Sequence, residues 1–145
     1  MALGDDIRTR LIDRVPALGG RVQAAADLAA LQRAGGWPGV TPAAHVVPMG
    51  LAGGPQAPVF PRFRQKIDRL WAVILTIRTH DANGARWLDR VEDLEADILD
   101  AMLGWAPVAH AEAFILKRAA LIRFETGTMV REMTFALTDT LETAQ

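Results

Sequence analysis

The residue types that usually perform catalysis are few in this chain and poorly spaced for it. The 145 residues include no Cys and no Ser, which excludes thiolate and serine nucleophiles, disulfides and zinc-thiolate sites. His45, His80 and His110 stand far apart, without the short spacing of a metal-binding pair. Carboxylates are numerous between residues 89 and 100, but no feature of the pattern makes one an acid and its neighbour a base. The sequence therefore predicts no catalytic residue and no metal ligand.

Cofactor and nucleic-acid motifs are also missing. The glycines at 35–36, 50 and 53–54 are followed by no GKS or GKT, and none belongs to a GxGxxG that opens a helix. Basic residues are not interleaved with aromatic ones in the manner of single-strand binders. We therefore expect no cofactor, no sequence-specific DNA binding and no enzyme activity.

Composition is that of a globular domain. Half of the residues are hydrophobic and the formal charge is −1, and 145 residues suit one domain, 1–145, whose core needs no metal or disulfide. No apolar run approaches the roughly 20 residues that span a bilayer. The N-terminus, MALGDDIRTR, lacks the hydrophobic segment of a secretory signal. We expect no membrane association, and a setting in the cytosol or in a particle assembled there.

The balanced total charge hides a gradient along the chain. Residues 1–66 carry eight Arg or Lys against four Asp or Glu, a net +4, whereas residues 67–105 carry four against eight, a net −4. Opposite patches on one domain allow head-to-tail association with copies of itself. Pairing within one subunit, or simple exposure to water, explains the same gradient.

A strand and the helix after it predict the centre of the fold. In IDRLWAVILTIRTH, residues 67–80, both faces are mainly apolar between Leu70 and Ile77, which is typical of a strand in the middle of a sheet. A helix is expected from about Ala85 to Leu103, because apolar residues recur there at three- and four-residue steps. Gly104 is placed to end it in a left-handed conformation.

The remaining elements complete an α+β domain. They are a helix over 5–15, a strand over 21–26, a brief helix over 28–33 after a capping Asp27, and strands over 43–47, 114–124 and 129–137. The polar tail after about residue 138 is expected to fray. We predict an antiparallel or mixed sheet of four to five strands with the helices on one face, the long acidic helix and the N-terminal helix packed on it.

A segment rich in Gly and Pro, MGLAGGPQAPVFP at 49–61, carries no charge and is predicted to be a loop. Loops of this length inside compact domains are uncommon and often bind a partner. Its apolar side chains favour a surface ordered against a partner, although a loop folded back over its own core would use them equally well. The candidate contact residues here and just beyond are Met49, Leu51, Val59, Phe60, Arg62 and Arg64.

The helix over 85–103 carries acids on nearly all of its polar positions. Asp97 and Asp100 lie near its C-terminal end, where negative charge opposes the helix dipole by a few tenths of a kcal/mol each, on the order given for exposed sites. Either the protein uses this negative face or it is a solvated surface. The candidate functional acids are Asp89, Glu92, Asp93, Asp97 and Asp100.

Six phrases of the chain carry a resemblance to a known family: IRTRLIDRVP at 7–16, VQAAADLAAL at 22–31, PAAHVVPMG at 42–50, QKIDRLWAVILTIR at 65–78, LDRVEDLEADILDAMLGW at 88–105 and GTMVREMTFAL at 127–137. In this order they resemble the tail terminator proteins of long-tailed bacteriophages, particularly those of Mu-like phages and prophages. The resemblance covers most of the chain and rests on the order of these phrases. The closing strand departs from the pattern, because many relatives have more aromatic residues there than Phe135 alone.

The resemblance implies a structural role in the virion. Tail terminators form a hexameric ring on the last ring of tail tube protein, stop its polymerisation and give the head, through a connector or neck protein, a docking surface. The implied place is the head-proximal end of the tail, after assembly in the host cytoplasm. DNA would pass through the ring, and the five acids named above would line the channel. Another phage neck protein or a small ligand-binding domain remains as an alternative.

Overall fold

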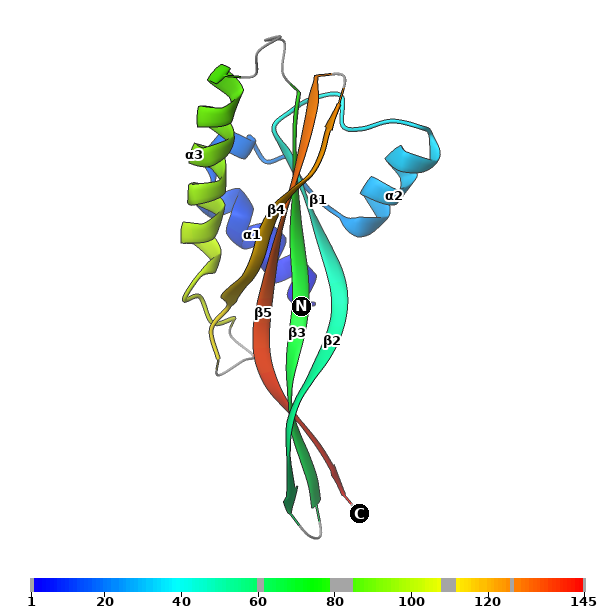
Figure 1. Ribbon diagram of the computed structural model, residues 1–145, viewed down its shortest axis with the longest axis vertical. Coiled ribbons are helices and arrows are strands. Elements are labelled where there is room, and N and C mark those ends of the chain that lie inside the picture. Colours follow the sequence, from blue (N-terminus) through cyan, green and yellow to red (C-terminus); the bar gives the residue numbers. More distant parts are fainter. Residues whose placement is uncertain (1, 60–61, 79–84, 108–111, 126, 145) are drawn as a thin grey trace.

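The computed structural model describes residues 2–59, 62–78, 85–107, 112–125 and 127–144, and for residues 55–59, 62, 85–87, 125 and 144 it describes the backbone alone. Within these ranges the chain forms a five-stranded mixed sheet and three α-helices (Figure 1). The sheet runs along the long axis of the molecule, and the helices gather toward one end of it. The expected α+β class is confirmed.

The elements follow the expected order. The helices are α1 (Leu3–Arg14), α2 (Ala25–Arg33) and α3 (Ala85–Met102), with a 3-10 turn, η1 (Pro16–Leu18), after α1. The strands are β1 (Val22–Ala24), β2 (Ala43–Val59), β3 (Arg62–Arg78), β4 (Ile115–Glu125) and β5 (Thr128–Ala144). In the sheet they stand in the order β1-β2-β3-β5-β4. β1 runs parallel to β2, and the other neighbouring pairs are antiparallel.

β3 is the middle strand, as its two apolar faces predicted. It pairs with β2 on one side and with β5 on the other, and its pairing with β5 runs from Arg62 to Arg78 without a register shift. Every side chain from Ala72 to Ile77 is buried, whichever face it points to. The β-branched and apolar run therefore sits where both faces of the sheet are covered.

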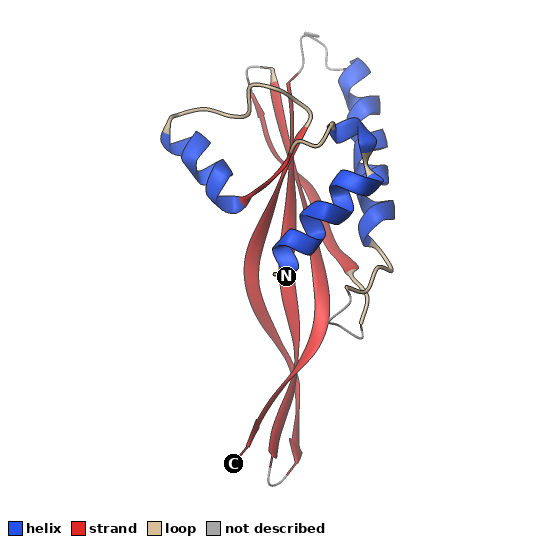
Figure 2. Cartoon of the chain, turned by 180° about the vertical axis from the view of Figure 1, so that it is seen from behind, coloured by secondary structure: helices blue, strands red, loops and turns tan. Residues whose placement is uncertain are grey.

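α1 and α3 cover one face of the sheet and form the main core with it (Figure 2). Their buried residues recur at helical spacing: Ile7 and Leu11 in α1, and Val91, Leu94, Ile98, Ala101 and Met102 in α3. Nε of Arg10 donates a hydrogen bond of 2.9 Å to the carbonyl oxygen of Ala101, one of the carbonyls that the end of α3 leaves without a helical partner. Gly104 follows with φ 77°, in the left-handed conformation that was expected.

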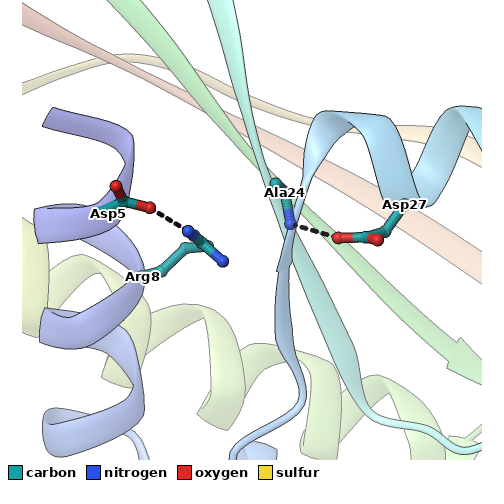
Figure 3. A network of polar contacts seen from close by, with 4 residues as sticks. All are labelled: Asp5, Arg8, Ala24 and Asp27. Carbon is teal, nitrogen blue, oxygen red and sulfur yellow. Dashed lines mark hydrogen bonds and ion pairs between the residues drawn. The ribbon is translucent and has the colours of Figure 1, made fainter. Parts of the chain in front are cut away.

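α2 lies on the opposite face, so the expectation that the helices share one face was wrong for this helix. Leu28 of α2 and Trp37 of the loop after it pack against Ala72, Ile74 and Val130 in a small second core. No residue of α2 is fully buried, so this helix covers its side of the sheet only partly. Oδ2 of Asp27 accepts a hydrogen bond of 3.1 Å from the backbone N–H of Ala24, which stabilises the first turn of α2 (Figure 3).

The loop predicted for 49–61 is wrong over residues 49–59, which continue β2. β2 pairs with β3 as far as Val59 opposite Arg62, while Phe60 and Pro61 lie outside the described residues. β1 pairs with β2 only as far as Val46, so beyond it β2 is an edge strand among the described elements. An edge strand tolerates proline, because its outward N–H groups have no ladder bond to lose. Register shifts after Pro48 and after Gly53 also help to accommodate the Gly- and Pro-rich sequence.

The frayed tail expected after residue 138 is also wrong, because β5 continues to Ala144. Its last residues pair with the first residues of β3, ending with Ala144 opposite Arg62. The polar residues of this segment are part of the pairing. Asp139 forms an ion pair with Arg69, and Glu142 forms one with Arg64.

The covered and open parts of the sheet are expected to differ sharply in their tolerance of truncation. Leu75→Ala should lower the free energy of unfolding by about 2–5 kcal/mol, because Leu75 is 1% exposed and its loss leaves a cavity. Leu51→Ala, at a site 57% exposed, should change it by no more than about 0.5 kcal/mol. Urea denaturation of both variants checks this, and equal losses would contradict the assignment of the core.

Candidate assembly surfaces

The end of the sheet far from the helices is a three-stranded ribbon, which we call the arm (Figures 1 and 2). It comprises residues 48–59 of β2, 62–66 of β3 and 138–144 of β5. Ile67 is the last buried residue of β3 beside it, and none of the arm's described side chains is buried. A small sheet needs a covered apolar face to be stable by itself. The arm instead presents both of its faces to its surroundings.

Three of the six candidate contact residues lie on this arm with described side chains. Met49 and Leu51 are exposed on β2, and Arg64 is exposed on β3. Val59 and Arg62 belong to the arm by their backbone alone, and Phe60 lies outside the described residues. The sequence grouped these residues as parts of a loop, whereas strand pairing is what brings them together.

Two ion pairs and a hydrogen bond fasten β3 to β5 along and near the arm. Nε of Arg64 lies 3.2 Å from Oε2 of Glu142, and Nε of Arg69 lies 3.0 Å from Oδ2 of Asp139. Oδ1 of Asp68 accepts a hydrogen bond of 3.0 Å from the hydroxyl of Thr138. All of these side chains are partly exposed, so each pair adds at most about 1 kcal/mol. Part of the basic N-terminal charge is therefore paired within the subunit.

The five candidate acids of α3 form an open negative face. Asp89, Glu92, Asp93, Asp97 and Asp100 are all exposed. No ion pair is found for any of them among the residues that the structure describes. The apolar stripe of α3 points at the sheet, so these carboxylates lie on the flanks and the outer side of the helix, with Glu92 on the same flank as Glu95. Their charge is available to whatever lies beside the helix.

Glu95 is the exception among the acids of α3, and sequence reasoning missed its role. Its Oε2 lies 2.6 Å from Nε of Arg131 on β5, a close ion pair whose alignment is not that of a hydrogen bond. The alternation of buried and polar side chains along β5 could have predicted this pair. Arg131 shares a face with the buried Met129, Met133 and Phe135, and a cation on such a face needs an acidic partner. The pair ties α3 to the sheet.

His45 is fully buried between β1 and β3, beside the equally buried Thr76. Burial lowers the pKa of the imidazole, because charge is disfavoured in an apolar setting, and the carboxylate of Asp27 opposes this more weakly. His80 and His110 lie outside the described residues. Among the residues that are described, no group of His, Asp and Glu could hold a metal ion.

An apolar hollow of about 260 Å³ lies at the base of the arm, lined by Leu3, Pro48, Gly50, Leu51, Arg69, Leu70 and Trp71. Small-molecule sites combine apolar walls with several convergent polar groups. Arg69 supplies the one charged group of this lining, and it is already paired with Asp139. The hollow therefore lacks the polar groups of such a site. Over the described residues, no helix has the length and apolar character needed to cross a membrane.

Comparison with known proteins gives one family and one fold. The family model described as "Phage tail terminator protein" matches residues 4–144, nearly the whole chain. No curated protein matches. A solved structure, "Virion of native gene transfer agent (GTA) particle", contains a chain of similar fold, with a TM-score of 0.52 and 20% identity. The match covers 93% of this chain and 92% of that one, so the likeness extends to the fold as a whole.

Acid is expected to destabilise the protein through His45. Because burial holds its pKa in the folded state below the ordinary value of about 6.5, the unfolded chain binds a proton more readily. The free energy of unfolding should therefore fall as pH is lowered from about 7.5 through the ordinary histidine pKa. The fall should be smaller in His45→Leu, which cannot titrate there. Urea denaturation between these pH values measures both, and identical pH dependence would contradict the assignment.

Proposed function

This chain belongs to the phage tail terminator family, and on that premise we propose that it forms a ring that caps the tail tube. The family consists of structural virion proteins, not enzymes, whose role lies in completing the tail by assembly with other tail and head proteins. The proposed ring is hexameric. It ends polymerisation of the tube protein, docks a head–tail connector or neck protein at the head-proximal end, and lets DNA through. It assembles in the host cytoplasm.

The arm is the observation that carries this proposal. It is long and extends away from the helices to the opposite end of the molecule (Figure 1), and none of its described side chains is buried. If the protein acted as a monomer, such a ribbon would add no stability to it, because neither of its faces is covered. Exposed Met49 and Leu51 add apolar surface that a contact would remove from water, at about 25 cal/mol per Å². We therefore assign the arm, with its six candidate residues, to contacts with a neighbouring subunit or with the tube.

The acidic face of α3 supports a channel for DNA. Five exposed carboxylates without described partners leave a negative field beside the helix. Repeated around a ring, such a face repels phosphate and keeps DNA moving, because retention on proteins comes mainly from cations that neutralise the backbone. We propose that Asp89, Glu92, Asp93, Asp97 and Asp100 line the channel.

Removal of the outer part of the arm, residues 54–66 and 140–144, is expected to abolish capping without unfolding the protein. Gly53 stands opposite Ile67, and Ile67 stands opposite Asp139. Replacing residues 54–66 by Asn-Gly and ending the chain after Asp139 therefore closes a short hairpin at a paired position. The free energy of unfolding should stay within about 1 kcal/mol, as expected when no buried side chain is removed. Binding to purified tail tubes should be lost.

The test needs a check of folding and a count of capped tubes. Circular dichroism and urea denaturation establish that the shortened variant is folded, and electron microscopy counts capped tube ends. Ile12→Thr, at a site 43% exposed on α1, serves as a control that should cap tubes normally. A folded variant without residues 54–66 and 140–144 that still caps tubes would refute the role of the outer arm in capping.

Charge reversal on α3 is expected to make the ring retain DNA. Asp93→Lys with Asp100→Lys should raise the affinity of the assembled ring for duplex DNA at low salt by about tenfold or more, because added cations bind phosphate. Asp13→Lys with Glu112→Lys changes the total charge equally at two other exposed sites and should have a much smaller effect. A filter-binding titration at several salt concentrations compares them. Equal gains in both variants would remove α3 from the channel.

A further inference from the structure

β4 exposes an unusual amount of apolar surface. Among its eleven residues, five large hydrophobic side chains are exposed: Ile115, Leu116, Leu121, Ile122 and Phe124. β4 is also the last strand in the sheet order, with no strand on its outer side among the described residues. Contiguous apolar surface of this kind on a soluble protein usually marks an interface.

Three of these side chains lie on the face of the sheet that α3 covers. Leu116 stands opposite Phe135, Leu121 opposite Arg131, and Phe124 opposite Met129, and residues opposite one another share a face. Arg131 reaches Glu95 of α3, which fixes that face as the helix side. Their exposed fractions of 38%, 50% and 54% mean that α3 leaves them uncovered. We call Leu116, Leu121 and Phe124 the β4 strip.

The charges around the β4 strip are negative on the helix side. Arg118 and Arg123 stand opposite Thr134 and Val130, on the other face of the sheet, where Arg123 lies over the ring of Trp37. On α3, Glu92 is exposed one helical turn before Glu95, which faces β5, so it lies on the same side of the helix. Arg131, opposite Leu121, is paired with Glu95, and Lys117, next to Leu116, is paired with Asp68, so Glu92 gives the β4 strip an acidic margin.

The subunit cannot cover the β4 strip with its own arm. β4 pairs with β5 only between Thr128 and Ala136, and the arm begins at Thr138 and runs away from β4 (Figure 1). A second β4 strip is a poor cover, because facing strips would bring two acidic α3 helices together. The cover must come from a different surface of another molecule.

The arm of a second copy has the complementary character. Alternation along β3, and the pairs Leu51 with Arg69 and Leu141 with Gln65, put Leu51, Phe63 and Leu141 on one face of the arm. Arg64 and Lys66 occupy the other face, and both are exposed; Glu142, opposite Arg64, is paired with it there. One side of the arm therefore carries three apolar side chains, beside Gln65, Thr143 and Asp139, whose charge is paired with Arg69. The other side keeps a net positive charge, because Glu142 offsets only one of its two exposed cations.

We propose that the arm of one copy lies on the β4 strip of the next copy, beside α3. The apolar face of the arm covers Leu116, Leu121 and Phe124. Its basic face then stands about 10 Å above the sheet, the height of a packed layer, level with the acids of α3. Each copy gives an arm and receives one through different surfaces, which is the heterologous contact that closes a ring. This assignment rests on the proposed ring and names the surfaces that form it.

Photochemical cross-linking tests the contact without assuming its register. A benzophenone analogue of phenylalanine placed at Phe124 should cross-link, in rings assembled on purified tail tubes, to peptides from residues 48–66 or 138–144. Mixing unlabelled and nitrogen-15-labelled chains shows that the two peptides come from different copies. The same analogue at Ile12 is the control and should give no adduct with these segments. Phe124→Asp should abolish ring formation, while Ile12→Asp should leave it intact.

The outcomes separate this contact from the ring itself. Adducts between copies that join residue 124 to the arm, together with loss of rings in Phe124→Asp, support the proposal. Rings that form normally but give adducts elsewhere, or only within one copy, overturn the contact and leave the ring standing. If the wild-type protein forms no ring on tube ends, the proposed function fails and this contact fails with it.

Discussion

The structure depends on the pairing of β3 along both of its edges. Its 17 residues are bonded to β5 without a register shift and to β2 with two shifts. At one end these three strands carry the helices, and at the other end the same strands continue as the arm. Backbone pairing, which needs no side-chain core, is what allows the ribbon to extend past the last buried residue. Fold and projecting surface are therefore one continuous element.

Burial divides the protein into two parts with different roles. Near the helices, the central strand is covered on both faces, and α1, α3 and α2 supply the cover from opposite sides. In the arm, the described side chains stay open, and ion pairs such as Arg64 with Glu142 hold adjacent strands together. Those pairs are solvated and weak, so the arm is ordered mainly by its ladder. A partner that covers it would add the apolar burial that it lacks.

Charge is distributed in the same divided way. Cations of the arm and acids of α3 occupy opposite regions of the molecule, and Glu95 is an acid of α3 with a described partner inside the subunit, Arg131. The other acids of the helix are exposed, and their negative charge acts on whatever lies beside the helix. Both proposed roles, repulsion of DNA in a channel and attraction of a neighbour's basic arm, follow from this negative charge, which no ion pair within the described part of the subunit neutralises. Glu92, at the margin of the acidic face, is the residue where the two uses meet.

The sequence by itself determined the central strand, the long helix with its glycine end, the α+β class and the exposed acids, because each depends on a local period of apolar residues. It misread residues 49–59 as a loop and the tail as frayed. Proline interrupts a strand where the ladder needs a backbone N–H at its position, and glycine weakens one where a side chain must pack. Neither requirement applies along this exposed edge. The polar tail forms a strand because β3 is there to pair with it. Only the tertiary structure decided the arm, the side taken by α2, and the Glu95–Arg131 pair, since each depends on residues far apart in the chain.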